Sequence, residues 1–475
     1  MSRVLMVVSE AGPYVKTGGL GDVMDALPAA LARLGEDVAV VVPRYQSVRL
    51  DSWERLLRDA PVSLGPHRFF VSVDEVIHHG VRYFFVDCPP LYDRPGIYNE
   101  GGYDYLDNHI RFGLLNQAAL AIARSIFRAD IFHCHDWPAA PLPLYLRTLY
   151  SGDPTFFGAR CVLTIHNLGY QGVFPASGFG DLGLDSTAYS PGAIEHFGEI
   201  NFLKAGVLWS DAITTVSPTY AREIQTPEYG FGLDGLLRAR ADRLHGILNA
   251  VDYEEWNPET DPYIATRYSA DDLLGKHASK IALLEELDLP RDSGRPLIGI
   301  VSRLVEQKGF DLVGGIAGEL LQQDLAMAVL GTGEPRFEQL FSDLAAARPD
   351  KFAVRFGYDP GLSHRIEAGA DMFLMPSRYE PCGLSQIYSL RYGTVPIVRA
   401  TGGLDDTVDH ETGFKFRDYS PGALSVAMGS ALEAWRDQEG WKSRMRRGMA
   451  KRYSWDASAD EYRKVYQSLR AATGP

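Results

Sequence analysis

The amino-acid sequence predicts an α/β protein with two Rossmann-like, doubly wound domains, each a mainly parallel sheet with helices on both faces. At 475 residues the chain is too long for one ordinary hydrophobic core, which favours two large domains. Short apolar runs alternate with segments of helical spacing almost from end to end, a pattern typical of buried parallel sheets. The alternation breaks once, around residues 256–262, and then restarts.

In the first half, an apolar run at residues 3–8 is followed by a glycine-rich loop and by helical spacing over 23–34. The next strand is expected at 37–42. Two apolar runs, 67–73 and 81–86, are separated by His78-His79-Gly80 and predict an antiparallel hairpin. Further parallel strands are expected in four runs with helical stretches between most of them, namely 131–134, 161–166, 212–216 and 246–249.

In the second half, strands are expected in five runs, namely 296–301, 326–330, 352–356, 372–375 and 395–398. The tail is predicted to be helical over 453–469, and its aromatic side chains indicate packing against another surface. We therefore expect an N-terminal domain over 1–255, a C-terminal domain over 256–455 and a terminal helix within 456–475.

Composition narrows the classes of function. A formal net charge of −14 argues against nucleic acid and anionic membranes as partners. The four cysteines, which are Cys88, Cys134, Cys161 and Cys382, are widely separated, so neither a disulfide scaffold nor a zinc cluster is expected and a reducing cytoplasm is favoured. The N-terminal segment is interpreted as the first strand and not as a signal peptide, and no apolar run is long enough to span a bilayer.

The segment from Arg378 to Tyr388 places an acid, Glu380, beside Pro381 and Gly383. It follows the apolar run 372–375 and precedes an amphipathic segment at 385–392, which predicts a strand, a tight turn and a helix. Backbone N–H groups and a carboxylate would then lie together at a helix N-terminus, where a phosphate and a sugar hydroxyl can both be held.

A second motif, Lys16-Thr17-Gly18-Gly19, lies between the first strand and the first helix. Ligands of open α/β sheets bind at this position, beyond the carboxyl end of a strand. Gly18 and Gly19 are expected to permit positive φ and close backbone approach, with Lys16 as a nearby cation. The spacing fits neither the dinucleotide fingerprint nor the phosphate loop, and an ordinary tight turn is the alternative.

Arg303 and Lys308 follow the first strand of the second half. A guanidinium fork and an ammonium together suit a diphosphate, whereas the alternative is a solvated surface pair. Tyr358 follows another strand, where its ring would either stack on a base or pack in the core.

Two histidine-containing segments, His133-Cys-His-Asp136 and Thr164-Ile-His166-Asn167, end two strands of the first domain and would bring Asp136 and His166 near the same sheet edge. Structural and functional roles both remain open for these histidines. A metal site built from His133, His135 and His166 is conceivable but is not expected, on the argument that side chains along a strand alternate between its two faces. Cys382 is not expected to be a nucleophile, because no histidine adjoins it in the sequence.

Taken together, the motifs KTGGLGDV, HCHDW, TIHNLGYQG, SRLVEQKG, GTGEP and RYEPCGLSQIYSLRYGTVPIVRATGGL resemble those of the bacterial glycogen synthase and plant starch synthase family, in order and spacing over almost the whole chain. The resemblance implies the GT-B architecture, in which two Rossmann-like domains face across a deep cleft and the last helix returns to the first domain. It also implies transfer of glucose from ADP-glucose to the non-reducing end of an α-1,4-glucan (glycogen), with retention of configuration and with no metal or other cofactor.

The resemblance further implies roles for individual residues. The positions matching catalytic residues are Glu380, His166, Arg303 and Lys308. The positions matching substrate-binding residues are Lys16, Gly18, Gly19, Asp22, Asp136, Asn167, Asn249, Tyr358, Cys382, Gly383, Leu384 and Ser385. Two positions differ from many relatives: Tyr388 stands where related nucleotide-sugar transferases carry a second Glu, and Pro138 stands where many members have His or Gln.

The same sequence features are compatible with two other functions. A retaining transferase that makes a small glucoside such as sucrose or trehalose would use the same residues, and a non-catalytic glucan-binding protein would keep the fold. A phosphorylase is disfavoured, because the chain is short and offers no pyridoxal-binding lysine context. The residues themselves do not choose between ADP-glucose and UDP-glucose.

Overall fold

The computed structural model describes residues 1–292 and 294–471, and it divides into two compact units. Unit 1 comprises residues 1–216, 221–248 and the chain from 455 onward, and unit 2 comprises residues 217–220 and 249–454. The compact units therefore change at 248/249 and 454/455, whereas the sequence suggested 255/256 and 455/456. The functional domain limits stay a prediction.

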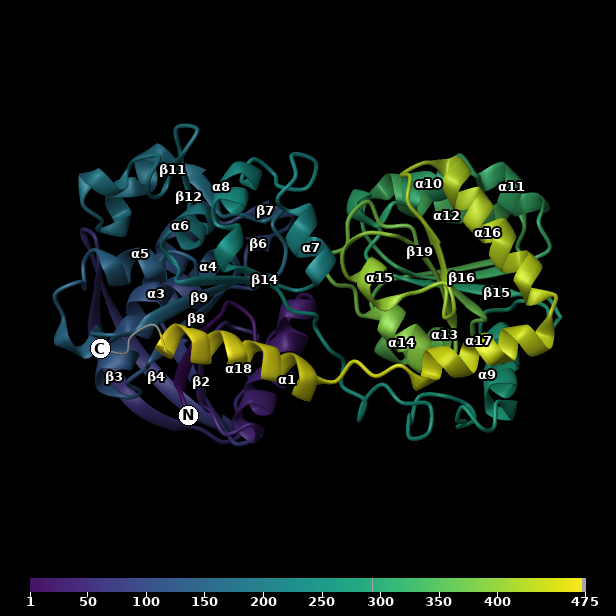
Figure 1. Ribbon diagram of the computed structural model, residues 1–475, viewed down its shortest axis with the longest axis horizontal. Coiled ribbons are helices and arrows are strands. Elements are labelled where there is room, and N and C mark those ends of the chain that lie inside the picture. The colour runs from purple at the N-terminus through teal and green to yellow at the C-terminus, as the bar shows by residue number, and fades with distance from the viewer. Residues whose placement is uncertain (293, 472–475) are drawn as a thin grey trace. The chain divides into compact units, whose positions relative to one another are not determined.

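Unit 1 is built on a nine-stranded sheet with the order β14-β13-β9-β8-β1-β2-β5-β4-β3 (Figure 1). Its strands are β1 (Arg3–Val7), β2 (Asp37–Pro43), β3 (Glu54–Leu64), β4 (His67–His78), β5 (Val81–Asp87), β8 (Ile131–His135), β9 (Arg160–Ile165), β13 (Ala212–Thr215) and β14 (Leu244–Gly246). The pairings from β14 to β5 are parallel, whereas β5–β4 and β4–β3 are antiparallel. The predicted hairpin is confirmed, although β4 continues to His78.

Helices cover this sheet, and smaller strands lie outside it. The helices are α1 (Gly19–Arg33), α2 (Pro89–Tyr92), α3 (Asn108–Ser125), α4 (Asp136–Ala139), α5 (Leu142–Arg147), α6 (Phe202–Trp209), α7 (Pro218–Glu223), which begins in unit 2, α8 (Asp234–Ala239) and α18 (Trp455–Ala471). The outer strands are β6 (Asn99–Glu100), β7 (Tyr103–Asp104), β10 (Val173–Pro175), β11 (Glu195–His196) and β12 (Glu199–Asn201). Short 3₁₀ helices lie at Pro154–Phe156, Ala176–Leu182, Ser186–Ala188 and Ala241–Arg243.

Unit 2 contains a six-stranded, wholly parallel sheet with the order β17-β16-β15-β18-β19-β20. Its strands are β15 (Leu297–Val301), β16 (Ala326–Gly331), β17 (Phe352–Phe356), β18 (Met372–Met375), β19 (Val395–Arg399) and β20 (Phe414–Phe416). Its helices are α9 (Leu274–Glu286), α10 (Phe310–Gly315), α11 (Ala317–Gln322), α12 (Pro335–Ala347), α13 (Pro360–Gly369), α14 (Ser385–Arg391), α15 (Gly402–Thr407), α16 (Pro421–Trp435) and α17 (Gln438–Ala450), with a 3₁₀ turn at Glu306–Lys308.

The core of unit 2 shows why its strands are almost continuously apolar. On β15, Ile298 and Ile300 belong to one hydrophobic cluster, whereas Leu297 and Val301 pack in another. Because successive side chains of a strand face opposite ways, the two clusters fill the two faces of the sheet. Both faces are therefore buried under helices, as the sequence pattern predicts.

The terminal helix α18 lies beside α1 in unit 1 (Figure 1). Tyr462 and Tyr466 are fully buried, and the Tyr466 hydroxyl lies 2.8 Å from His133 Nδ1. Asp456 pairs with Arg33 of α1 at 2.9 Å. The predicted return of the tail to the first domain is thus confirmed. No helix in the described part of the chain is long and apolar enough to cross a membrane.

Candidate active site

Glu380 lies in the connection between β18 and α14 of unit 2, and its carboxylate is almost completely buried. One oxygen, Oε2, accepts hydrogen bonds from Lys308 Nζ at 2.6 Å and from Ser377 Oγ at 3.0 Å. Within the described residues, the other oxygen, Oε1, accepts no hydrogen bond. The buried charge of Glu380 is thus paired through one oxygen, which leaves the other as an acceptor for a ligand.

The loop after β15 carries Lys308 to this carboxylate. Gly309, directly after Lys308, has φ of 73°, and a Cβ at this position would lie 2.0 Å from the carbonyl oxygen of Pro376. The backbone N–H of Arg378 also donates to the carbonyl of Gln307 at 2.9 Å. These close backbone approaches require glycine at 309 and join two loops that are about 70 residues apart in the sequence.

Arg303 and Tyr358 are exposed residues that follow β15 and β17, two strands of the unit 2 sheet separated by β16. Arg303 is exposed and forms no ion pair with any of the described residues. Tyr358, which follows β17, has 84% of its surface exposed. A core role for Tyr358 is therefore excluded, and both side chains are accessible to a ligand.

The Thr401-Gly402-Gly403-Leu404 segment packs against the backbone of the loop that carries Glu380. A Cβ on Gly402, which has φ of 45°, would lie 1.8 Å from the carbonyl oxygen of Glu380, and one on Gly403 would lie 2.1 Å from that of Cys382. Any larger residue would displace the loop that carries the acid. These glycines therefore serve backbone packing.

The turn that leads into α14 contains the last four predicted binding residues. Gly383 has φ of 72°, Leu384 is half-buried, and Ser385 begins the helix. Burial raises the pKa of the Cys382 thiol to about 12, so this thiol stays protonated near neutral pH, which agrees with a non-nucleophilic role. The first N–H groups of α14 have no partner within the helix.

Asn249 lies beside this turn at the start of unit 2. Its backbone forms a hydrogen bond with the Cys382 thiol. Its side-chain carbonyl oxygen is buried and has no hydrogen-bond partner. A buried polar atom without a partner is costly, which points to a ligand that completes it.

In unit 1, the loop before α1 holds Lys16 in an ion pair with Asp22, with Nζ and Oδ1 2.8 Å apart. Both side chains are nearly half exposed. A Cβ at Gly21 would lie 2.3 Å from Cβ of Lys16, so this glycine lets the lysine pack against the helix start. The start of α1, the helix that follows Lys16, therefore positions this lysine.

The expected positive φ at Gly18 and Gly19 is wrong. Gly18 is extended, with φ of −167°, and neither glycine is among those with positive φ. A Cβ at either position would meet no atom within 4 Å. What these glycines provide is open space along the backbone, consistent with the expected close approach of a ligand.

Glu10 holds this loop in place and was not predicted from the sequence. Its buried carboxylate accepts from Thr17 Oγ1 at 2.9 Å and from the Tyr98 hydroxyl at 2.6 Å. The signal available in the sequence was an acid just beyond the end of the first strand, ahead of a glycine-rich loop. Ser377, the partner of Glu380, was missed for a similar reason: a lone serine after a strand carries no specific pattern.

Asp136 and His166 meet at the carboxyl ends of β8 and β9, as expected. Asp136 has φ of 55°, a rare conformation for a residue other than glycine, and its Oδ1 accepts from the backbone N–H groups of His166 at 2.7 Å and Asn167 at 3.4 Å. Burial raises the pKa of Asp136 to about 7, although the two backbone hydrogen bonds act in the opposite direction and lower it. The strained aspartate thus fixes the start of the loop that carries His166.

The histidines of this edge are neutral at physiological pH. Burial lowers the pKa of His133 and of His166 to about 3. His166 Nε2 lies 2.9 Å from Nδ1 of His135. Both ring nitrogens of His133 are engaged, one by Thr164 and the other by Tyr466. The rings of His133 and His135 have centroids 4.1 Å apart, so the expectation that they face opposite ways is wrong, because residues two apart in a strand share a face.

Comparison with known proteins decides the family. The starch synthase catalytic domain model matches residues 3–239, and the model for glycosyl transferases of group 1 matches residues 286–448. The glycogen synthase of Koribacter versatilis is 47% identical over all of this chain and 99% of its own length, and that of Anaeromyxobacter sp. (strain Fw109-5) is 51% identical over 99% and 100%. This chain belongs to the glycogen synthase family.

Solved structures agree with the family. The catalytic domain of starch synthase IV from Arabidopsis thaliana, bound to ADP and acarbose, matches with a TM-score of 0.90 and 32% identity over 99% of both chains. A sucrose-phosphate synthase from Thermosynechococcus elongatus matches with a TM-score of 0.59 at 17% identity, which shows a likeness of fold alone. The resemblance found in the sequence and the GT-B fold class are therefore confirmed for this glycogen synthase family member.

Proposed function

We propose that this protein is an ADP-glucose-dependent glycogen synthase, which transfers glucose to the non-reducing end of an α-1,4-glucan with retention of configuration. Family membership over the full length supports glucosyl transfer to a glucan. The related starch synthase IV structure is described as bound to ADP and acarbose, which favours an adenine nucleotide donor and a glucan acceptor for this chain.

The observation that carries the proposal is the arrangement around Glu380. Its Oε2 holds the Lys308 ammonium at 2.6 Å, and the remaining N–H groups of Lys308 can donate to a phosphate oxygen. Its Oε1 can accept from a sugar hydroxyl. One buried acid would therefore fix both a cation for the leaving diphosphate and the orientation of the glucose.

Other residues of unit 2 would complete the donor site. The exposed guanidinium of Arg303 provides a fork suited to a diphosphate, and the exposed ring of Tyr358 can stack on adenine. The turn from Cys382 to Ser385 and the unpartnered side-chain oxygen of Asn249 would bind sugar hydroxyls and phosphate. These groups act by positioning and by stabilising charge that develops on the leaving group.

For unit 1, the roles are those that the family resemblance implies. Lys16, with the open backbone at Gly18 and Gly19, would bind phosphate, and Asp22 would orient Lys16. His166 would hold the primary hydroxyl of the glucose or steady the developing oxocarbenium character, as a neutral imidazole. Asp136 and Asn167 would position the His166 loop.

In the proposed reaction, the bond from the anomeric carbon to the diphosphate breaks, and the acceptor 4-hydroxyl attacks the same face of the sugar. The departing phosphate oxygen takes the proton of that hydroxyl. Lys308 and Arg303 stabilise the negative charge that builds on the diphosphate. No step requires a metal or other cofactor.

The direct experiment compares radiolabelled ADP-glucose with radiolabelled UDP-glucose as donors and uses glycogen as the acceptor. Parallel reactions replace glycogen with the small acceptors from which sucrose and trehalose are made. We expect glycogen to be labelled, faster from ADP-glucose, and the rate to persist in the presence of a chelator. Labelling of a small acceptor in place of glycogen would overturn the assignment, and a faster rate from UDP-glucose would overturn the proposed donor.

A further inference from the structure

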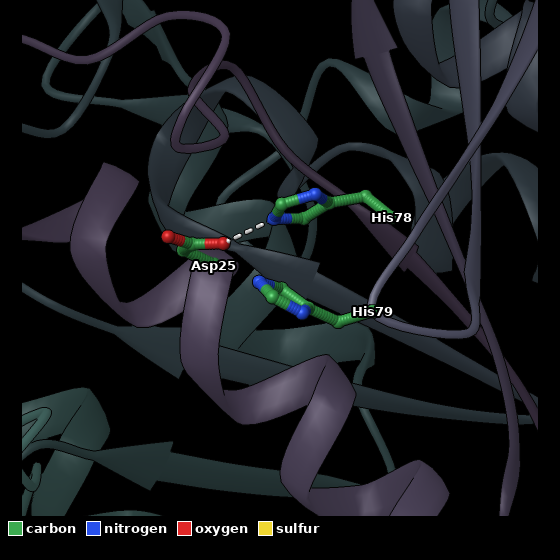
Figure 2. Close-up of side chains that lie close together, drawn as sticks. All are labelled: Asp25, His78 and His79. Atoms are coloured by element: carbon green, nitrogen blue, oxygen red, sulfur yellow. Dashed lines mark hydrogen bonds and ion pairs between the residues drawn. The ribbon is translucent and has the colours of Figure 1, made fainter. Parts of the chain in front are cut away.

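Three side chains with metal-binding donor atoms meet in unit 1, beside the loop that carries Lys16, and none of the three was assigned above to sugar or phosphate. Asp25 projects from α1, and His78 and His79 come from the end of β4 and the turn that follows it (Figure 2). One donor atom of each residue lies within 4.8 Å of the other two. Among the residues that the structure describes, no other group of three meets this criterion.

The backbone places these donors on rigid elements. His78 is the last residue of β4 and pairs with Val81 of β5. His79 and Gly80, with φ of 49° and 79°, form the two-residue turn between the strands. Asp25 lies in the middle of α1, so the three donors join a helix to a hairpin.

The present geometry is close to what a metal ion needs. His78 Nε2 lies 2.8 Å from Asp25 Oδ1, and the ring centroids of His78 and His79 are 4.0 Å apart. Donors around a tetrahedral zinc ion, with bonds of about 2.0–2.1 Å, lie about 3.4 Å from one another. In the proposed site, the exposed His79 side chain rotates toward Asp25 to complete the donor set.

Aromatic rings hold His78 in place beside Asp25. The rings of Tyr14 and Tyr83 pack edge-on against His78 with centroids 5.8 and 5.9 Å away, which limits the orientation of the imidazole. A fixed imidazole beside a carboxylate is a good metal ligand.

We propose that Asp25, His78 and His79 bind a divalent transition-metal ion of the zinc type. Two imidazole nitrogens and one carboxylate oxygen form a donor set suited to Zn²⁺, whereas Mg²⁺ and Ca²⁺ prefer oxygen ligands alone. Water completes the coordination on the exposed side of His79. The proposal of a metal site does not depend on the proposed transfer reaction.

The ion would connect α1 and the β4–β5 hairpin beneath the Lys16 loop. Asp25 is one helical turn beyond Asp22, the partner of Lys16, and a Cβ at Gly12 of the loop would lie 3.3 Å from Cβ of Asp25. Tyr14 of the same loop contacts His78. Binding of the ion is therefore expected to stabilise unit 1 at the base of this loop.

The test titrates metal-free, full-length protein with Zn²⁺ against a chromophoric chelator, with Mg²⁺ in a parallel titration, and records the thermal midpoint in each case. We expect one Zn²⁺ per chain and a higher midpoint with Zn²⁺ but not with Mg²⁺. H79N and D25N should each weaken Zn²⁺ binding by at least about tenfold, since even outer partners of metal ligands contribute about 10–100-fold. H277N, at an exposed position on α9, should bind Zn²⁺ as the original protein does.

H79N separates loss of a ligand from loss of the fold. Asn tolerates positive φ, and Asn-Gly is a favoured pair for a two-residue hairpin turn, so the metal-free variant should keep the original midpoint. The proposal is overturned if Zn²⁺ does not bind at one per chain, if H79N and D25N bind it as tightly as H277N, or if Mg²⁺ binds more tightly than Zn²⁺.

Discussion

The two oxygens of Glu380 have different environments, and this difference assigns the residue its role. Oε2 is engaged by Lys308 and Ser377, whereas Oε1 accepts no hydrogen bond from the described residues. A carboxylate tied to an ammonium at 2.6 Å is a poor nucleophile, because its charge is already stabilised. The geometry favours a residue that orients the sugar and holds the lysine.

Replacing Glu380 with Gln tests this role. The variant keeps the shape of the side chain but loses the charge that holds Lys308, and we expect turnover to fall by roughly 10²–10³-fold, the range for removing a preorganised electrostatic group. Ser377→Ala, which removes only a supporting hydroxyl, should cost far less. An E380Q rate within a few-fold of the original, in a protein with an unchanged circular dichroism spectrum, would refute the central placement of Glu380.

Arg303→Ala tests the charge on the leaving group. A hydrogen bond to a charged group contributes about 1.5–3 kcal/mol, so the loss of Arg303 should lower kcat by about 10–150-fold. Lys308→Ala should lower it as well and should also destabilise unit 2, since it leaves the buried Glu380 unpaired. Arg436→Ala, whose side chain is 77% exposed on the surface, provides the control and should change neither quantity. Near-normal turnover in R303A would remove Arg303 from this role.

The residue types of the candidate site follow from the sequence, but their contacts do not. Glu380, Lys308 and Arg303 each stand out because they follow an apolar run at the end of a strand. The ion pair between Glu380 and Lys308 joins positions 72 residues apart, so it depends on strand order, which no local pattern reveals. Ser377 and Glu10 were missed because their importance lies entirely in such contacts.

Among the elements, the connections that follow strands carry almost all the candidate site residues. The two Thr-Gly-Gly-Leu segments show how one local pattern serves two purposes. Gly18 and Gly19 border open space, whereas Gly402 and Gly403 lie against the backbone of the Glu380 loop. Shared turn chemistry explains both, but the close packing exists only in unit 2.

Gly309→Ala tests the junction between the two loops of unit 2. The added Cβ would lie 2.0 Å from the Pro376 carbonyl oxygen at a φ of 73°, so the loop must shift and carry Lys308 with it. We expect at least a tenfold loss of turnover and a lower free energy of unfolding, by about 1–3 kcal/mol. Gly429→Ala, in the middle of α16 with no atom within 4 Å of the new Cβ, should instead leave turnover unchanged and stabilise the protein slightly. Equal effects of the two variants would contradict this account of Gly309.

The centres of most strands were predictable, whereas their ends and the edges of the sheets were not. Buried strands such as β15 and β16 have continuous apolar sequences, and they lie where the sequence placed them. The edge strand β3 was missed because most of its residues are partly or fully exposed and its register shifts twice. The three-residue β20 is too short to leave a pattern.

At the scale of the whole molecule, α18 joins the end of the chain to unit 1 through a buried histidine network. Tyr466 reaches His133, which in turn contacts Thr164, while His135 contacts His166. The aromatic spacing of the tail predicted its packing, but the identity of its partner came only from the family resemblance. The Asp25–His78–His79 group was not foreseen either, since in the sequence the two histidines indicated only a hairpin turn.

This network makes the stability of unit 1 sensitive to acid. Burial lowers the pKa of His133 to about 3 from an ordinary value of 6.5. Between these two pH values, the unfolded chain binds a proton at His133 and the folded protein does not. The contribution to stability is complete above about pH 6.5 and falls as the pH decreases toward 3, by about 1.4 kcal/mol for one histidine at pH 5.5. The pKa of His135 and that of His166 are lowered too, and both add in the same direction.

Calorimetry checks this prediction by comparing thermal midpoints at pH 7.5 and 5.5 in the original protein and in His133→Asn. The His133→Asn variant loses hydrogen bonds and should be less stable at both pH values. Its thermal midpoint should fall less from pH 7.5 to pH 5.5 than that of the original protein. A midpoint that does not fall with pH in the original protein, or that falls equally in H133N, would contradict the assignment of the acid sensitivity to His133.

The central claim is that this chain adds glucose to the non-reducing ends of an α-1,4-glucan. The most direct measurement supplies labelled ADP-glucose and glycogen and then digests the purified polymer with β-amylase, which removes maltose units from the non-reducing ends of α-1,4-linked chains. The account predicts that the label enters glycogen and is released almost entirely as maltose. Label that stays out of the polymer, or that enters it but resists this digestion, would contradict it.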